Sequence, residues 1–156
     1  AEVGYWFAAP AVGYALGNFL SARYSTRIGM NRMILIGAVI CTGALSGALL
    51  MDLMGFHAPL VFFGGVAFMG MGNGMLLPNA NAGMMSVRPE LAGTASGLGG
   101  ALAVAGGAGL AALAGAFLHD DAGAAPLLII MAATAGGSIL SILWVIARER
   151  QIVQGR

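Results

Sequence analysis

Long uncharged stretches alternate with short charged ones along the whole of this chain. Five runs contain no Asp, Glu, Lys or Arg, and they cover residues 3–22, 33–51, 58–87, 91–118 and 122–147. Each run meets or nearly meets the roughly 20 apolar residues that a helix needs to cross the hydrocarbon of a bilayer. The pattern therefore predicts an all-α membrane protein with five transmembrane helices, at about residues 3–22, 33–51, 58–85, 91–118 and 124–147.

Composition agrees with this fold class. Hydrophobic residues make up 59% of the 156 positions and charged residues 8%, against about 25% charged residues in a soluble domain. The net charge of +1 gives no reason to expect a nucleic-acid partner. The single cysteine, Cys41, lies inside an expected span and cannot build a disulfide framework.

The few charges segregate by side. If the loop at residues 23–32 is cytoplasmic, every arginine falls on the cytoplasmic side, and Glu2, Asp52, Asp120 and Asp121 fall on the other. The cationic residues are Arg23, Arg27, Arg32, Arg88, Arg148, Arg150 and Arg156. This is the positive-inside pattern of multi-pass proteins, and it predicts a cytoplasmic C-terminus.

Glycine is unusually frequent, at 26 of 156 residues, where about 7% is typical. Small residues let membrane helices approach closely, so we expect a tightly packed bundle. The GxxxG spacings are Gly13/Gly17, Gly43/Gly47, Gly70/Gly74 and Gly93/Gly97. The Gly/Ala-rich run at 91–118 suits helix contact, and the Leu/Ile-rich segment at 127–146 suits lipid contact.

The chain has no carboxylate pair, metal-ligand cluster, nucleophile triad or phosphate-binding glycine loop. We therefore predict neither an enzyme nor a bound cofactor or metal.

The third run contains the most polar chemistry, in Asn73, Asn79 and Asn81 around Pro78. Amides at membrane depth need partners that lipid does not offer, so they bond a neighbouring helix or line a water-filled cavity. Both alternatives remain open for these asparagines. Pro78 removes one backbone hydrogen bond and should bend the helix. Met69 adds adaptable apolar surface, which suits core filling as well as varied ligands.

The first loop also allows two interpretations. Its arginines either hold the loop on the cytoplasmic side or bond helix ends and acidic partners, and so act as a conformational latch.

Two segments resemble a known family. Residues 22–32 resemble the loop signature Gly-x-Leu-Ala-Asp-Arg-x-Gly-Arg-Arg/Lys of the major facilitator superfamily, with Arg27, Gly29 and Arg32 fitting best. Ala22 stands at the first Gly and Thr26 at the Asp, so this copy lacks the acidic part. Residues 89–98, after the Pro-Asn-Ala-Asn-Ala run at 78–82, resemble the opening of helix eleven in drug:proton antiporters of the Bcr/CflA (bicyclomycin-resistance) type.

The resemblance implies that residues 1–156 are a C-terminal transmembrane fragment, corresponding to helices eight to twelve of a twelve-helix transporter. In that family, substrate binds at the midplane between two halves. The implied substrate-cavity residues are Tyr14, Asn18, Met69, Asn73, Asn79 and Asn81. The conformational loop motif would comprise Arg23, Arg27, Gly29 and Arg32. Helix packing or kinking would involve Pro78, Gly93 and Gly97.

The function implied by the resemblance is proton-coupled multidrug efflux, the export of amphipathic drug-like molecules by alternating access across a bacterial inner (plasma) membrane, with a role in antibiotic resistance. No carboxylate lies inside the expected spans, so the proton would be carried by the missing half. The alternatives are a non-transporting membrane assembly subunit and a facilitator-family carrier of another small solute.

Overall fold

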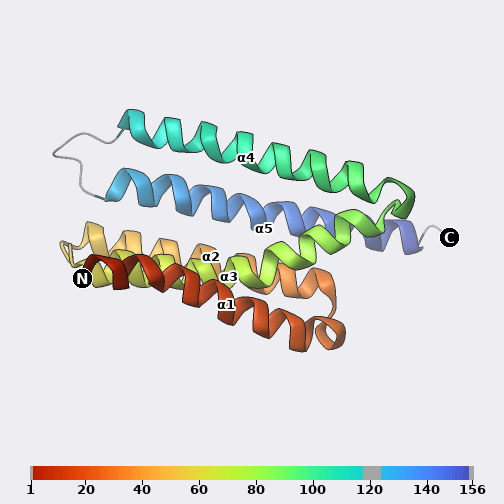
Figure 1. Cartoon of the computed structure of the whole chain (residues 1–156), viewed down its shortest axis with the longest axis horizontal. Coiled ribbons are helices and arrows are strands. Elements are labelled where there is room, and N and C mark those ends of the chain that lie inside the picture. The colour runs from red at the N-terminus through yellow and green to blue at the C-terminus, as the bar shows by residue number, and fades with distance from the viewer. Residues whose placement is uncertain (1, 118–123, 155–156) are drawn as a thin grey trace.

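The computed structural model describes residues 2–117 and 124–154. The elements are α1 (Glu2–Ile28), α2 (Met30–Leu53), α3 (Pro59–Ser86), a 3-10 turn η1 (Pro89–Leu91), α4 (Ala92–Phe117) and α5 (Ala125–Gln154). Residue 118 of the fourth expected span, together with Asp120, Asp121 and Arg156, lies outside the described residues. The long helices run in alternating directions (Figure 1).

Four of these helices, α2 to α5, are long and apolar enough to cross a membrane. Helix α1 is also long but is not among them. Its aliphatic residues are diluted by several glycines and by polar or weakly apolar side chains, including Pro10, Tyr14 and Asn18. The expectation of five transmembrane helices is therefore supported for four and stays a prediction for α1.

Helix α3 forms the centre of the bundle. It packs along α1 and α2, and α5 packs against the other side of α2 (Figure 1). The buried core cluster contains Leu45 and Ala48 of α2 and Leu128 of α5. The C-terminal part of α3, the helix that contains Pro78, turns away from α1 toward α4 and α5 in Figure 1, as expected where a proline interrupts the helical hydrogen bonds.

Helix α4 lies at the edge of the bundle (Figure 1) and touches α3 and α5 only sparingly. One contact is at Gly99, which faces the side chain of Met84. This arrangement differs from the expectation that the Gly/Ala-rich helix makes the contacts and the Leu/Ile-rich helix faces lipid. Within the described structure α5 is the better packed, because it packs along α2 and its own residues Leu128 and Ile142 are buried, whereas α4 has only sparse contacts.

Close backbone contact holds α1 against α3. A Cβ atom on Gly13 would lie 3.0 Å from the carbonyl carbon of Ala67 and closer still to its oxygen. Gly17, Gly70 and Gly74 are equally confined, each by backbone atoms of the facing helix. These four glycines form two GxxxG pairs, one on α1 and one on α3, and the two pairs lie in the same interface between these helices.

A second close approach joins α2 to α3. A Cβ on Gly72 would lie 2.5 Å from both Cys41 Sγ and the carbonyl oxygen of Gly37. Glycine on two sides of α3 therefore lets it approach both neighbours, as membrane helices do where small residues meet.

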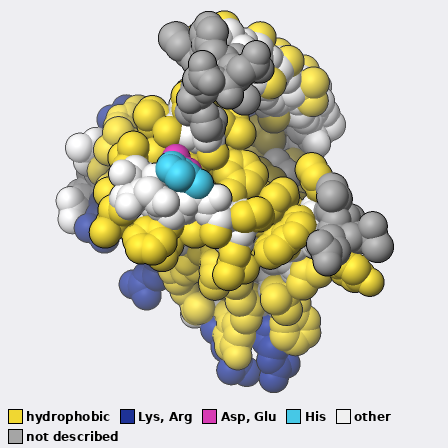
Figure 2. All heavy atoms as spheres, turned by 90° about the vertical axis from the view of Figure 1, so that its left-hand side faces the viewer, with side chains coloured by type: hydrophobic (Ala, Val, Ile, Leu, Met, Phe, Trp, Pro, Cys, Tyr) yellow, Lys and Arg dark blue, Asp and Glu magenta, His cyan; other side chains and the backbone are white. Residues whose placement is uncertain are grey.

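The described arginines lie at one end of the bundle, together with Glu90 and Glu149, and Asp52 lies at the other end. Figure 1 shows the α1–α2 turn, the α3–α4 connection and the end of α5 at one end, and these segments carry Arg23, Arg27, Arg32, Arg88, Arg148 and Arg150. Figure 2 views the other end, where a histidine and an acidic side chain lie among hydrophobic side chains and the dark blue of arginine shows only at the margins. His57 Nδ1 is 3.0 Å from Asp52 Oδ1.

Candidate functional site

A buried polar cluster joins α1 to α3. Asn79 is 4% exposed, and its Nδ2 donates to Ser21 Oγ on α1 and to the carbonyl of Met75, both at 2.7 Å. Ser25 Oγ donates to Asn79 Oδ1. Both ends of the amide are therefore satisfied by protein, and the structure shows interhelical bonding at this position.

Asn73 and Met69 lie together in a different place, on the side of α3 that faces α2 and α5. They line a pocket of about 240 Å³ with Cys41, Thr134 and Ser138. Cys41 Sγ donates to the carbonyl of Met69 at 3.3 Å and is 3.6 Å from Asn73 Oδ1. The hydroxyls of Thr134 and Ser138 bond carbonyls of their own helix. The pocket is small, but it combines an amide with apolar walls in the middle part of α3.

The remaining cavity candidates are not gathered into that pocket. Asn18 and Tyr14 lie on α1, where Asn18 Nδ2 donates to the carbonyl of Tyr14 at 2.9 Å. Both residues border Gly74 of α3. Asn81 is exposed on α3. The structure thus pairs Met69 with Asn73 and Tyr14 with Asn18, and a shared substrate cavity for the whole set stays a prediction.

The loop motif occupies the sharp turn between α1 and α2. Gly29 has φ 95°, a conformation that favours glycine. Its N–H donates to the carbonyl of Ser25 at 2.9 Å, and its own carbonyl accepts from the N–H of Met33 at 3.1 Å. Arg23 and Arg27 precede it at the end of α1, and Arg32 follows in the first turn of α2. All three arginine residues are exposed.

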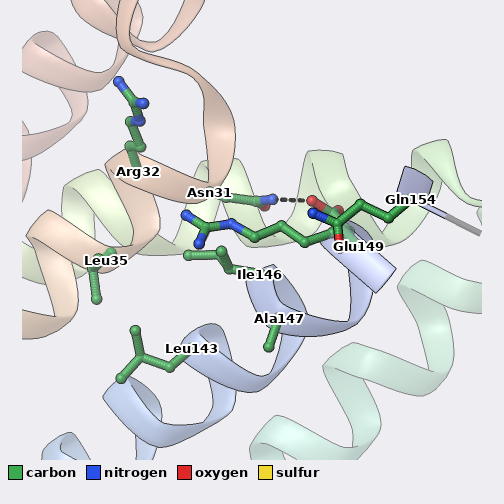
Figure 3. Close-up of a pocket in the computed structure, with 9 residues that line it drawn as sticks. Asn31, Arg32, Leu35, Leu143, Ile146, Ala147, Glu149 and Gln154 are labelled. Carbon is green, nitrogen blue, oxygen red and sulfur yellow. Dashed lines mark hydrogen bonds between the residues drawn. The ribbon is translucent and has the colours of Figure 1, made fainter. Parts of the chain in front are cut away.

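Sequence reasoning missed one contact of this turn. Asn31 Nδ2 donates to Glu149 Oε2 on α5 at 2.6 Å, which ties the start of α2 to the end of α5 (Figure 3). No periodicity relates residues so far apart in the chain. The sequence offered only a weak signal for this contact, namely that the start of α2 and the end of α5 both carry polar residues.

The remaining packing candidates have different surroundings. Pro78 lies inside α3. Gly93 and Gly97 have no atom within 4 Å of where a Cβ would stand, so a role in helix packing stays a prediction for them. Among the described residues, no group of His, Cys, Asp and Glu could hold a metal ion.

The apolar helices, their alternating directions and the polar contacts buried between them define an integral, multi-pass membrane protein. Residues 1–155 match the family model of the Major Facilitator Superfamily, and the chain belongs to that superfamily. Because these proteins are transporters, the prediction that the chain is not an enzyme is confirmed.

A curated relative extends this assignment. The chain is 32% identical over 153 residues to a protein of Haemophilus influenzae (strain ATCC 51907 / DSM 11121 / KW20 / Rd) that is called "Bicyclomycin resistance protein homolog". The alignment covers 95% of this chain and 36% of the relative, so the chain spans about a third of the relative's length. No solved structure gives a significant match.

Proposed function

We propose that this chain forms part of a transporter that exports amphipathic, drug-like molecules across a bacterial inner membrane in exchange for protons. The observation that carries the proposal is the match along 95% of the chain with a relative named for bicyclomycin resistance. An all-helical fold with four candidate membrane spans supports it. The chain would be of the Bcr/CflA type and would form part of the C-terminal half.

In this proposal α3 supplies one wall of the substrate pathway. Asn81 is the exposed amide of the helix, and Asn73 borders a pocket together with Met69. A few polar groups among apolar side chains are typical of sites for amphipathic ligands. Asn79 has the different task of holding α1 against α3, since its amide is fully bonded.

Alternating access would occur by rocking of the two halves of the transporter. The turn at Gly29 and the contact between Asn31 and Glu149 would then belong to the end that opens and closes toward the cytoplasm. The arginines gathered at this end support a cytoplasmic location for it and for the C-terminus.

Proton coupling requires an ionisable group at membrane depth whose pKa responds to substrate. Three carboxylates have side chains that the structure describes, and all three lie near helix ends. Asp52 lies beside His57, Glu90 is in η1, and Glu149 lies beside Asn31. We therefore assign proton binding to the part of the transporter outside this chain.

The test is transport by the purified full-length protein in proteoliposomes with an acidic lumen. Bicyclomycin or an amphipathic cationic dye should accumulate inside as protons leave, and a protonophore should abolish the accumulation. Substrate flux that equilibrates without a proton gradient would favour a facilitator. Absence of flux for every substrate, from protein that is folded and monodisperse, would favour a non-transporting assembly subunit.

A further inference from the structure

A groove opens between α2 and α5 at the arginine-bearing end of the bundle. It encloses about 640 Å³ between Leu35 of α2 and Leu143, Ile146 and Ala147 of α5. Figure 3 shows these side chains below the bond between Asn31 and Glu149. The walls of the groove are thus apolar, and its rim is polar.

A second hollow adjoins the first. It measures about 800 Å³, and its apolar lining includes Ile34 of α2, Leu76 of α3 and Val145 of α5. Asn31, Arg32 and Glu149 line both spaces. The two hollows therefore share one polar rim above apolar walls.

The rim is positively charged. Arg32 and Arg150 both line the first groove, against the single carboxylate of Glu149. That carboxylate already accepts a 2.6 Å hydrogen bond from Asn31. The described residues form one close contact between oppositely charged groups, His57 with Asp52 at the other end, so neither arginine has an acidic partner among them. In Figure 3 the Arg32 side chain points away from the Asn31–Glu149 bond and from Leu35 and Leu143, so its guanidinium must turn toward the groove to share a phosphate with Arg150.

We propose that this groove binds an anionic phospholipid of the adjoining leaflet, with its phosphate bonded by Arg32 and Arg150 and an acyl chain lying along Leu35, Leu143 and Ile146. A guanidinium presents a planar fork of donors that matches a phosphate. Basic pockets between membrane helices are suited to anionic headgroups, and each arginine near such a surface contributes appreciably to binding. The inference does not depend on which substrate the transporter carries.

Charge and hydrocarbon act together at this site. An apolar groove alone would accept any phospholipid, and two exposed arginines alone would accept any phosphate. Together, the arginines and the apolar walls select a lipid with an anionic headgroup and an acyl chain. Glu149 opposes the anion, so its charge sets the affinity below what the two arginines alone would give.

The experiment is native mass spectrometry of the purified full-length protein with phosphatidylglycerol, and with phosphatidylcholine of the same acyl chains. Phosphatidylglycerol should bind more tightly. The double variant Arg32→Gln/Arg150→Gln should weaken its binding roughly tenfold or more. The control Arg88→Gln/Arg148→Gln removes the same charge from the same end and should weaken it less than threefold.

Two further variants separate the parts of the site. Glu149→Gln keeps an acceptor for Asn31 but removes the opposing charge, so phosphatidylglycerol should bind more tightly. Leu143→Trp should fill the groove and weaken the binding of both lipids. The Glu149→Gln variant moves affinity upward, which loss of folding cannot imitate.

Several results would overturn the proposal. Equal binding of the two lipids would leave only a neutral apolar groove. Equal loss in the two double variants would leave only diffuse surface charge. Displacement of phosphatidylglycerol by millimolar inorganic phosphate would assign the site to free phosphate, and weaker binding in Glu149→Gln would contradict the charge argument.

Discussion

Replacing Gly17 by alanine tests whether the α1–α3 interface depends on close backbone contact. The new Cβ would lie closest to the carbonyl oxygen of Met71, then 2.9 Å from the carbonyl carbon of Met71 and 3.0 Å from Cα of Gly74. Ordinary van der Waals contact begins at 3.4 Å, so the helices must part by at least 0.5 Å. The obstructing atoms belong to a helix backbone, which cannot rotate out of the way.

The cost follows from that separation. A gap of 0.5–1 Å forfeits roughly a quarter to a half of each dispersion contact that it opens, and overpacking a close-packed core typically costs about 1–3 kcal/mol. We therefore expect Gly17→Ala to lower the free energy of unfolding by about 2 kcal/mol.

Gly43→Ala is the matched control, because Gly43 belongs to a GxxxG pair with the same spacing but has no atom within 4 Å of the Cβ position. Alanine is the better helix former, so this variant should be neutral or more stable by about 0.5 kcal/mol. Unfolding of the full-length protein by SDS in mixed micelles, followed by circular dichroism, measures both values. Equal effects of the two substitutions would refute the idea that backbone contact at Gly17 holds α1 to α3.

Three other predictions follow from single residues. Asn79→Ala should lower the free energy of unfolding by about 1–2 kcal/mol in the same SDS titration, because two hydrogen bonds to α1 are lost. Substitution of the exposed Asn81 by alanine should lower it by under about 0.5 kcal/mol. Similar values for the two variants would contradict the bonded cluster. Gly29→Ala should lower the free energy of unfolding by about 1–3 kcal/mol, because the φ of 95° at this position is unfavourable for a residue with a Cβ. An unchanged titration midpoint would show that the turn adopts another backbone conformation without loss of stability. Arg27→Ala should slow transport in the proteoliposome assay more than Arg148→Ala if the loop is a conformational latch; equal, negligible effects would reduce its charge to a topology signal.

The candidate site was predictable only in outline. Polar groups at membrane depth in the third run indicated that α3 carries chemistry, since an amide cannot remain unpaired in hydrocarbon. The sequence left interhelical bonding and cavity lining open for all three asparagines. The structure divides them: Asn79 is bonded to α1, Asn73 borders a pocket near α5, and Asn81 is exposed. Their directions around α3 and the turn of that helix beyond Pro78 decide the difference.

The sequence by itself determined the apolar segments, their order and the end at which the arginines gather. These are local properties, because placing one charged residue at the centre of a membrane helix costs about 2.5–3.5 kcal/mol whatever its neighbours are. Only the tertiary structure decided which small residues meet. Four GxxxG pairs have identical spacing, yet only Gly13/Gly17 and Gly70/Gly74 face each other. Gly43/Gly47 and Gly93/Gly97 have no atom within 4 Å of the position that a Cβ would take. Spacing fixes the face of a helix on which glycines lie, whereas the helix that packs there depends on the arrangement of the whole bundle.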